Sequence, residues 1–258
     1  MTEIPEQKTE SSRQKIRKWI LILSFVLLPV TLVYISPIII VMGAAEGIAT
    51  GSMLLFSAIF IISLFVARLW CGWLCPMGAW QEICSPVMKH TVLDGWRNSV
   101  KYLVTALWLA LIALLFFTAG GIRTVDPFYS TDNGLSITSL PFLVVVAVIF
   151  AIIFMVAYLA GRRGFCHVLC PIAALMIVGR KIRNFVGWPA LQLGADAARC
   201  IDCNKCSKEC PMGLDVHGMV REERMENAEC IVCGSCADTC PKGAIRYGIM
   251  GRCGSEKP

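Results

Sequence analysis

Two cysteine-rich runs with the same spacing lie near the carboxyl end of the 258-residue sequence. Each reads C-x2-C-x2-C-x3-C-P, with Cys200, Cys203, Cys206 and Cys210 in the first run and Cys230, Cys233, Cys236 and Cys240 in the second. Three closely spaced thiolates can bind three irons of one cubane, whereas the fourth, beside a proline, reaches another cubane. This spacing predicts two [4Fe–4S] clusters. Zinc sites usually show paired cysteines, and disulfides are rare in the cytoplasm.

The crossed use of the fourth cysteine predicts the metal ligands of each cluster. Cluster one is expected to bind Cys200, Cys203, Cys206 and Cys240, and cluster two is expected to bind Cys230, Cys233, Cys236 and Cys210. Both runs lie within 188–258, for which we predict a small α+β domain; it resembles the bacterial-type two-cluster ferredoxins over 198–248. A domain of about 60 residues buries little apolar surface, so the clusters are expected to stabilise it.

Four further cysteines lie in an internal repeat of the form R-x2-C-x3-C-P. Equivalent residues are 95 positions apart: Arg68, Cys71, Cys75 and Pro76 in the first copy, and Arg163, Cys166, Cys170 and Pro171 in the second. Residues four apart share a helix face, so each copy can present two thiolates in one direction. We favour a shared iron–sulfur or other metal centre, while a reversible dithiol in each copy and simple apolar packing stay open. The arginines either balance a negative cluster or anchor the membrane edge.

Long apolar segments must position these cysteines. The sequence is 56% hydrophobic and 16% charged, whereas an ordinary soluble domain has about 25% charged residues. Four segments, at 19–43, 48–67, 102–120 and 140–160, have the roughly 20 apolar residues that a membrane-spanning helix needs. Each C-x3-C-P motif follows a pair of spans. We therefore predict an all-α membrane domain over 19–187 that contains four transmembrane helices in two parallel two-helix repeats, with a tail at 1–18.

Basic residues predict the orientation of these spans. Five Lys and Arg residues precede the first span, four lie between the second and third, and five follow the fourth, against Arg123 alone in the other two loops. Because basic loops stay in the cytoplasm, both termini are expected there, in a multi-pass protein of the inner membrane. This distribution also explains the net charge of +6 without a nucleic-acid partner.

Five other polar residues or thiols have weaker signals. Cys84 and Cys253 fall outside every motif and are expected to have no ligand role. His167 occurs in the second copy of the repeat only. It could bond a cluster sulfur or move a quinone proton, but a packed or snorkelling histidine is favoured. Glu46 and Asp126 lie on the outer side, where turn formation is favoured over a role in proton release from a quinol.

The whole arrangement resembles the NapH-type membrane polyferredoxins, and the membrane-and-ferredoxin half of the NosR-type proteins is similar, over 15–248. The resemblance implies an electron-transfer subunit that relays electrons between the quinone pool and partner subunits of a quinol dehydrogenase or related complex. It implies no autonomous enzyme. The alternative is a redox-sensing or maturation factor for a partner oxidoreductase. A transporter is disfavoured, because the spans are nearly devoid of charge.

Overall fold

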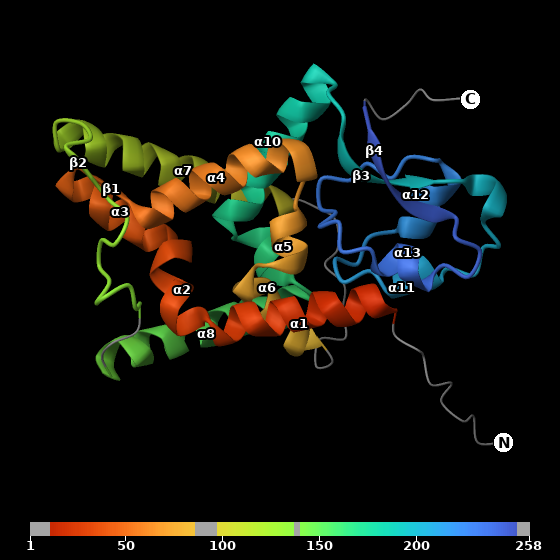
Figure 1. The fold of residues 1–258 in the computed structure, drawn as a ribbon, viewed down its shortest axis with the longest axis horizontal. Helices are drawn as coiled ribbons and strands as arrows, with labels where there is room; N and C mark the ends of the chain where they lie inside the picture. Colours follow the sequence, from red (N-terminus) through yellow and green to blue (C-terminus); the bar gives the residue numbers. More distant parts are fainter. Residues whose placement is uncertain (1–10, 86–96, 137–139, 252–258) are drawn as a thin grey trace.

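The structure is a computed structural model that describes residues 11–85, 97–136 and 140–251. A helical part and a small cysteine-rich part lie at opposite ends of the long axis (Figure 1). The helical part contains α1 (Ser12–Val26), α2 (Leu28–Ile35), α3 (Pro37–Glu46), β1 (Ile48–Thr50), α4 (Gly51–Val66), α5 (Leu69–Trp73), α6 (Pro76–Ile83), α7 (Arg97–Thr118), β2 (Thr124–Asp126), α8 (Leu140–Ala160), α9 (Gly164–Val168) and α10 (Pro171–Val186).

The cysteine-rich part is held together by a two-stranded antiparallel ribbon. It contains β3 (Ala190–Ala195), the 3-10 helix η2 (Ala197–Arg199), α11 (Lys205–Lys208), α12 (Val216–Arg221), α13 (Ser235–Thr239) and β4 (Ile245–Met250). In the ribbon, Ala190 lies opposite Met250, so the two ends of this part pair with each other. The predicted small α+β domain has this composition of short helices and one ribbon.

The prediction of four spans is confirmed only in part. Asn98–Thr118 and Leu143–Ala160 are long and apolar enough to cross a membrane. The first predicted span is broken, because α1 and α2 meet at an angle of 84° and α3 starts afresh at Pro37. Proline accompanies both breaks: Pro29 lies in the first turn of α2, where its missing N–H cannot continue α1, and Ser36 before Pro37 is extended. The described residues therefore offer two candidate spans, or three if the bent pair counts as one.

The second predicted span is too short as a helix. The 16 residues of α4 cover about 24 Å, whereas the hydrocarbon core is about 30 Å thick. Helix α4 packs instead along α10, which also contacts α7 (Figure 1). Helix α10, which begins at the proline of the second C-x3-C-P motif, thus contacts both α4 and α7.

The helical part is closed at the end remote from the cysteine-rich part. There β1 and β2 pair in parallel, with Thr50 opposite Asp126 (Figure 1). The Asp126 carboxylate accepts the N–H of Phe128 at 2.9 Å, so this residue forms the expected turn. Gly51 lies so close to the next turn that a Cβ atom would be 2.2 Å from the carbonyl oxygen of Pro127.

Replacing Gly51 by alanine should therefore destabilise the protein, by about 1–3 kcal/mol, because the backbone of Pro127 must move to admit the methyl group. Thermal unfolding of the full chain in detergent, followed by circular dichroism, measures the effect. Ser57→Ala, at an exposed position on the same helix, is the matched control. Equal midpoints for the two variants would contradict the prediction.

Candidate iron-sulfur sites

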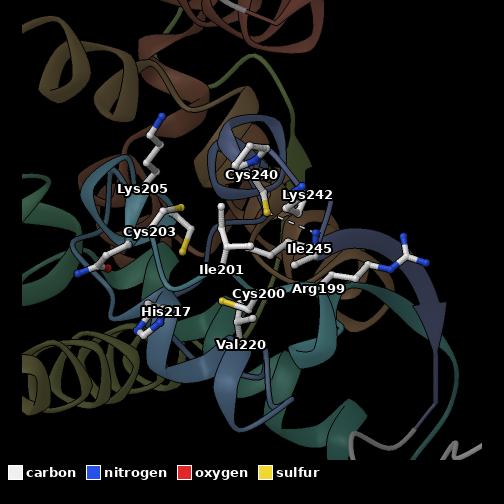
Figure 2. Close-up of a pocket in the computed structure, with 14 residues that line it drawn as sticks. Arg199, Cys200, Ile201, Cys203, Lys205, His217, Val220, Cys240, Lys242 and Ile245 are labelled. Carbon is white, nitrogen blue, oxygen red and sulfur yellow. Dashed lines mark hydrogen bonds between the residues drawn. The ribbon is translucent and has the colours of Figure 1, made fainter.

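The four cysteines predicted for cluster one line a single pocket (Figure 2). Cys200 and Cys203 come from the segment that leads into α11, Cys206 lies within α11, and Cys240 follows α13. We call this the cluster-one pocket. Cys206 is buried, but Cys203 is exposed. The donor set fits a [4Fe–4S] cluster, which takes four thiolates.

The four cysteines predicted for cluster two line a second pocket, which we call the cluster-two pocket. Its cysteines are Cys210, Cys230, Cys233 and Cys236, so the fourth cysteine of each run lies with the first three of the other run. Burial raises the pKa of the Cys210 thiol to about 11. A metal must displace this proton to bind, and the placement fits the predicted ligand set without testing it directly.

The two C-x3-C-P copies have the same local backbone, but it differs from the continuous helix that we expected. A short helix is capped by Leu74 in the first copy and by Leu169 in the second, and these leucines have φ/ψ of −123°/−18° and −121°/−20°. The next residue is extended, with −72°/117° at Cys75 and −70°/114° at Cys170, and a new helix starts at the following proline. Proline again explains the break. The second thiol of each motif thus lies at a helix N-terminus, where a thiolate is favoured.

The four thiols of the repeat lie close enough to interact electrostatically. Burial, together with negative charge on Cys71 and Cys166, raises the pKa of Cys75 to about 12. Cys170 is affected by the other three thiols in the same way. Four thiolates cannot coexist here without positive charge, which a bound metal would supply in addition to Arg68 and Arg163.

Two buried side chains complete the surroundings of these thiols. The Met176 sulfur lies 3.6 Å from Sγ of Cys71, and the Gln81 amide donates to Sγ of Cys166 at 3.3 Å. Met176 and Gln81 are both fully buried. They exclude water from the site and fix the orientation of one thiol in each copy.

The arginines of the repeat are buried in protein, so the membrane-anchor interpretation is wrong. Arg68 and Arg163 are 0% and 2% exposed. Arg163 donates to the carbonyl oxygen of Cys71 at 2.9 Å and pairs with Glu82, which also pairs with Arg17. Nε and Nη2 of Arg68 and Nε of Arg163 are buried without a hydrogen-bond partner among the described residues. Orphaned cationic donors beside four thiols fit an anionic cluster.

A buried charge cluster joins the helical part to the cysteine-rich part. Glu229, directly before Cys230, accepts from Nη1 of Arg68 at 2.8 Å and from Lys101 Nζ. Burial by itself would raise the pKa of Glu229, but the two cations together hold it below its usual range. Glu229 is therefore ionised at neutral pH and balances two cations that have no access to solvent.

Residues 228–233, which carry two ligands of the cluster-two pocket, are held by backbone contacts along their whole length. The carbonyl oxygens accept from side chains of the helical part: Ala228 from Arg68 at 3.3 Å, Cys230 from Arg180 at 3.5 Å, Val232 from Trp73 at 3.2 Å and Cys233 from Gln14 at 3.1 Å. The indole N–H of Trp73 thus binds the helical part to the cysteine-rich part.

Equivalent positions of the repeat contact both sides of the cluster-two pocket. A Cβ atom on Gly72 would lie 2.4 Å from the carbonyl oxygen of Ile231. At the equivalent position, His167 Nε2 lies 3.3 Å from the carbonyl oxygen of Met212. Ile231 and Met212 both line the cluster-two pocket. The pocket is therefore seated on both C-x3-C-P copies.

His167 is a packed residue in this arrangement. It is 1% exposed, and burial lowers its pKa to about 4, so its ring is neutral at neutral pH. Of the two other cysteines, Cys84 ends α6 as a half-buried thiol outside both pockets. Cys253 lies outside the described residues.

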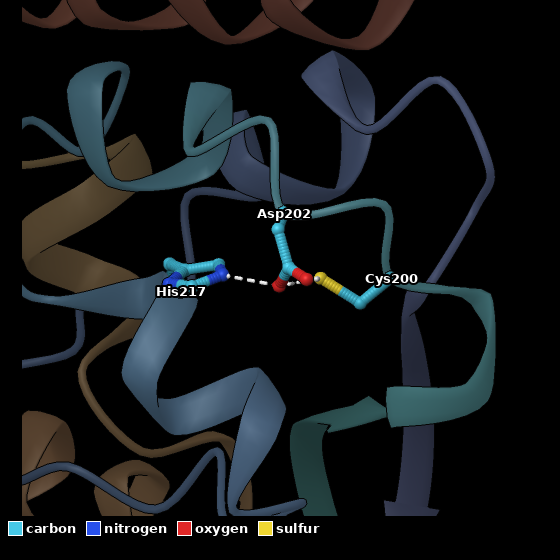
Figure 3. Close-up of side chains that lie close together, drawn as sticks. All are labelled: Cys200, Asp202 and His217. Carbon is cyan, nitrogen blue, oxygen red and sulfur yellow. Dashed lines mark hydrogen bonds and ion pairs between the residues drawn. The ribbon is translucent and has the colours of Figure 1, made fainter.

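A polar cluster beside the cluster-one pocket joins Cys200, Asp202 and His217 (Figure 3). Nε2 of His217 lies 2.8 Å from the Asp202 carboxylate, whereas the Cys200 sulfur is 3.7 Å from the same oxygen. These three groups could hold a metal ion by geometry. Cys200 is already one of the four predicted ligands of cluster one, and His217 lines the same pocket. We therefore assign His217 and Asp202 to the border of the cluster-one pocket.

Sequence reasoning missed the partners of the predicted residues. Glu229 and Glu82, which pair with the arginines of the repeat, were not singled out, nor was Lys101, which shares the Glu229 carboxylate with Arg68. One signal was available, because an acidic residue directly precedes Cys230 at the start of the second run. Its partner at position 68 is distant in sequence, and only packing brings the two together.

Known protein families match both cysteine-containing regions. A 4Fe-4S binding domain matches residues 48–91 and 142–189, which include both C-x3-C-P copies, and a 4Fe-4S dicluster domain matches residues 199–245. The chain thus contains 4Fe-4S domains, and it has apolar helices that are long enough to cross a membrane. No solved structure matches the chain.

Several named proteins are similar over most of the chain. YccM of Escherichia coli strain K12, named as an electron transport protein, is 26% identical over 72% of this chain and 53% of its own length. The methylamine utilization ferredoxin-type protein MauN of Methylorubrum extorquens is 27% identical over 68% of this chain and 59% of its own length. The regulatory protein NosR of Pseudomonas aeruginosa is 27% identical over 64% of this chain and 24% of its own length. The chain thus spans about half of YccM, and the predicted resemblance to NosR-type membrane polyferredoxins is confirmed.

Replacing Glu229 by glutamine should destabilise the full chain by about 3–5 kcal/mol, because Arg68 and Lys101 then stay buried without a counter-charge. Denaturant unfolding in detergent measures the loss. Glu222→Gln removes one negative charge from an exposed position of the same part and should change the unfolding free energy by less than about 0.5 kcal/mol. Similar values for both variants would show that the charge cluster does not join the two parts.

Proposed function

We propose that this protein is a membrane-anchored iron–sulfur electron-transfer subunit that connects the quinone pool to redox partner subunits. The observation that carries the proposal is the seating of the cluster-two pocket on both C-x3-C-P copies, through Gly72 and His167. A redox site in the helical part would therefore adjoin the cysteine-rich part directly. Clusters bound at these cysteines would supply one-electron transfer.

We further propose a third [4Fe–4S] centre at Cys71, Cys75, Cys166 and Cys170. Support comes from the electrostatic proximity of the four thiols, from the unpaired donors of Arg68 and Arg163, and from the 4Fe-4S binding domain that matches both copies. The two guanidinium groups stabilise negative charge at the site. Gln81 and Met176 shield it from water.

Charge and the positions of the first and last described elements support an orientation in the membrane. The described chain begins at α1, where Arg13 pairs with Asp238 of the cysteine-rich part, and it ends after β4 in that same part. The β1–β2 pair lies at the opposite end (Figure 1). We infer that the cysteine-rich part and both termini are cytoplasmic, at the basic side of the inner membrane.

A second candidate function is a redox-sensing or maturation factor for a partner oxidoreductase. It is favoured by the similarity to NosR, which is named a regulatory protein. The two functions differ in one respect that can be measured: an electron-transfer subunit must exchange electrons with a quinol at a useful rate, whereas a sensor or maturation factor need not.

The iron content tests the third centre. The purified full chain should contain about twelve irons and as many sulfides, since three [4Fe–4S] clusters hold four each. Cys71→Ala should lose about four irons while the EPR signals of the two ferredoxin-type clusters persist. Cys84→Ala, at a neighbouring thiol outside the motif, should lose none. About eight irons in the unmodified protein would rule out the third centre.

Quinol oxidation tests electron transfer. In membranes that contain the full chain, a menaquinol analogue should reduce the clusters, or an oxidised analogue should reoxidise them, within seconds. The EPR or visible absorbance change should be smaller in Cys166→Ala and unaffected in Cys84→Ala. If dithionite reduces the clusters but no quinol or quinone exchanges electrons with them, the sensor or maturation function replaces the proposal.

A further inference from the structure

The two cluster pockets have opposite surroundings. The cluster-two pocket is bounded by residues 228–233, whose backbone is covered by the helical part. The cluster-one pocket has exposed residues at its border: Cys203 is exposed and Ile201 is 54% exposed (Figure 2). These exposed residues put the cluster-one pocket within reach of a second protein.

The charged residues that line the cluster-one pocket are all basic among the described residues. They are Arg199, Lys205 and Lys242, and no acidic side chain joins them (Figure 2). Arg199 is balanced by Asp196 at 2.9 Å, but the ammonium groups of Lys205 and Lys242 form no ion pair with a described residue. Both lysines are exposed. They leave an uncompensated positive charge beside the exposed isoleucine.

The acidic residue nearest this border is already occupied. Asp202 pairs with His217 at 2.8 Å and with Arg221 at 3.6 Å. Its negative charge therefore does not cancel those of the two lysines. The border consists of one apolar side chain, one exposed thiol and two unpaired cations.

We propose that the border of the cluster-one pocket, formed by Ile201, Cys203, Lys205 and Lys242, is the docking surface for a small acidic one-electron carrier protein. This inference rests on the proposed electron-transfer function and names its partner. Transient redox complexes use small interfaces, in which complementary charge steers the encounter and a few apolar contacts bring the redox groups together. One electron passes between the carrier and the loaded protein, so one is oxidised as the other is reduced, and no bond or proton is exchanged.

Stopped-flow electron exchange tests the docking surface. The probe is a reduced acidic two-cluster ferredoxin, mixed with the oxidised, cluster-loaded full chain in detergent. The second-order rate constant should fall steeply as salt increases. It should be about tenfold lower in Lys205→Glu and in Lys242→Glu, because charge steering changes association rates by such factors.

Lys15→Glu is the matched control, since it makes the same charge change at an exposed position of α1, next to the Gln14 contact with the cluster-two pocket. Its rate constant should stay within about twofold of the unmodified protein. Dithionite should reduce the clusters of all variants to the same extent, which shows that they are folded and loaded.

Three results would overturn the docking proposal. These are equal rate constants for the lysine variants and the control, binding of anionic lipid vesicles lost in the lysine variants while carrier exchange is unchanged, and salt-dependent self-association through this border in place of carrier exchange. A failure of quinol to exchange electrons, with carrier exchange intact, would overturn the proposed function and leave the docking surface standing.

Discussion

The buried carboxylate of Glu229 is the interaction on which the arrangement of the two parts depends. It balances Arg68 and Lys101, neither of which reaches solvent. Separating the members of such a cluster leaves a buried charge without a counter-charge, which costs free energy. The pairing therefore restrains the cysteine-rich part to one position on the helices. Because Glu229 directly precedes Cys230, this restraint acts on a predicted cluster ligand. Electrostatic pairing thus aligns the cluster-two pocket with the repeat.

The two arginines of the repeat make different contacts although they occupy equivalent positions. Arg68 pairs with Glu229 in the cysteine-rich part, whereas Arg163 pairs with Glu82 on α6 within the helical part. Both lie beside the four thiols and carry unpaired donors. The arginine of the first copy therefore attaches the cysteine-rich part, whereas the arginine of the second copy links helices of the helical part. The positive charge that both contribute favours thiolates, and hence metal binding, at a site that is otherwise too buried for them.

The cysteine-rich part has a covered side and an open side. On its covered side, residues 228–233 of the cluster-two pocket contact the helices, and on its open side Cys203 of the cluster-one pocket is exposed. Clusters bound at these two pockets would suit the proposed transfer from a site beside the helices to a separate protein. The similarity to proteins named for electron transport and as ferredoxin-type agrees with this arrangement.

The sequence by itself determined the groups of four cysteines, because iron–sulfur ligation requires particular spacings over a few residues, and each predicted set of the ferredoxin runs lies in one pocket. It also determined the repeat, whose prolines dictate the same backbone in both copies. Pro29 and Pro37 likewise mark in the sequence where the first predicted span can bend or end, and the helices break there. Only the tertiary structure decided which charges neutralise the buried arginines and which pocket stays open. Those properties depend on contacts between residues far apart in the chain, such as Arg68 and Glu229, and no local spacing encodes them.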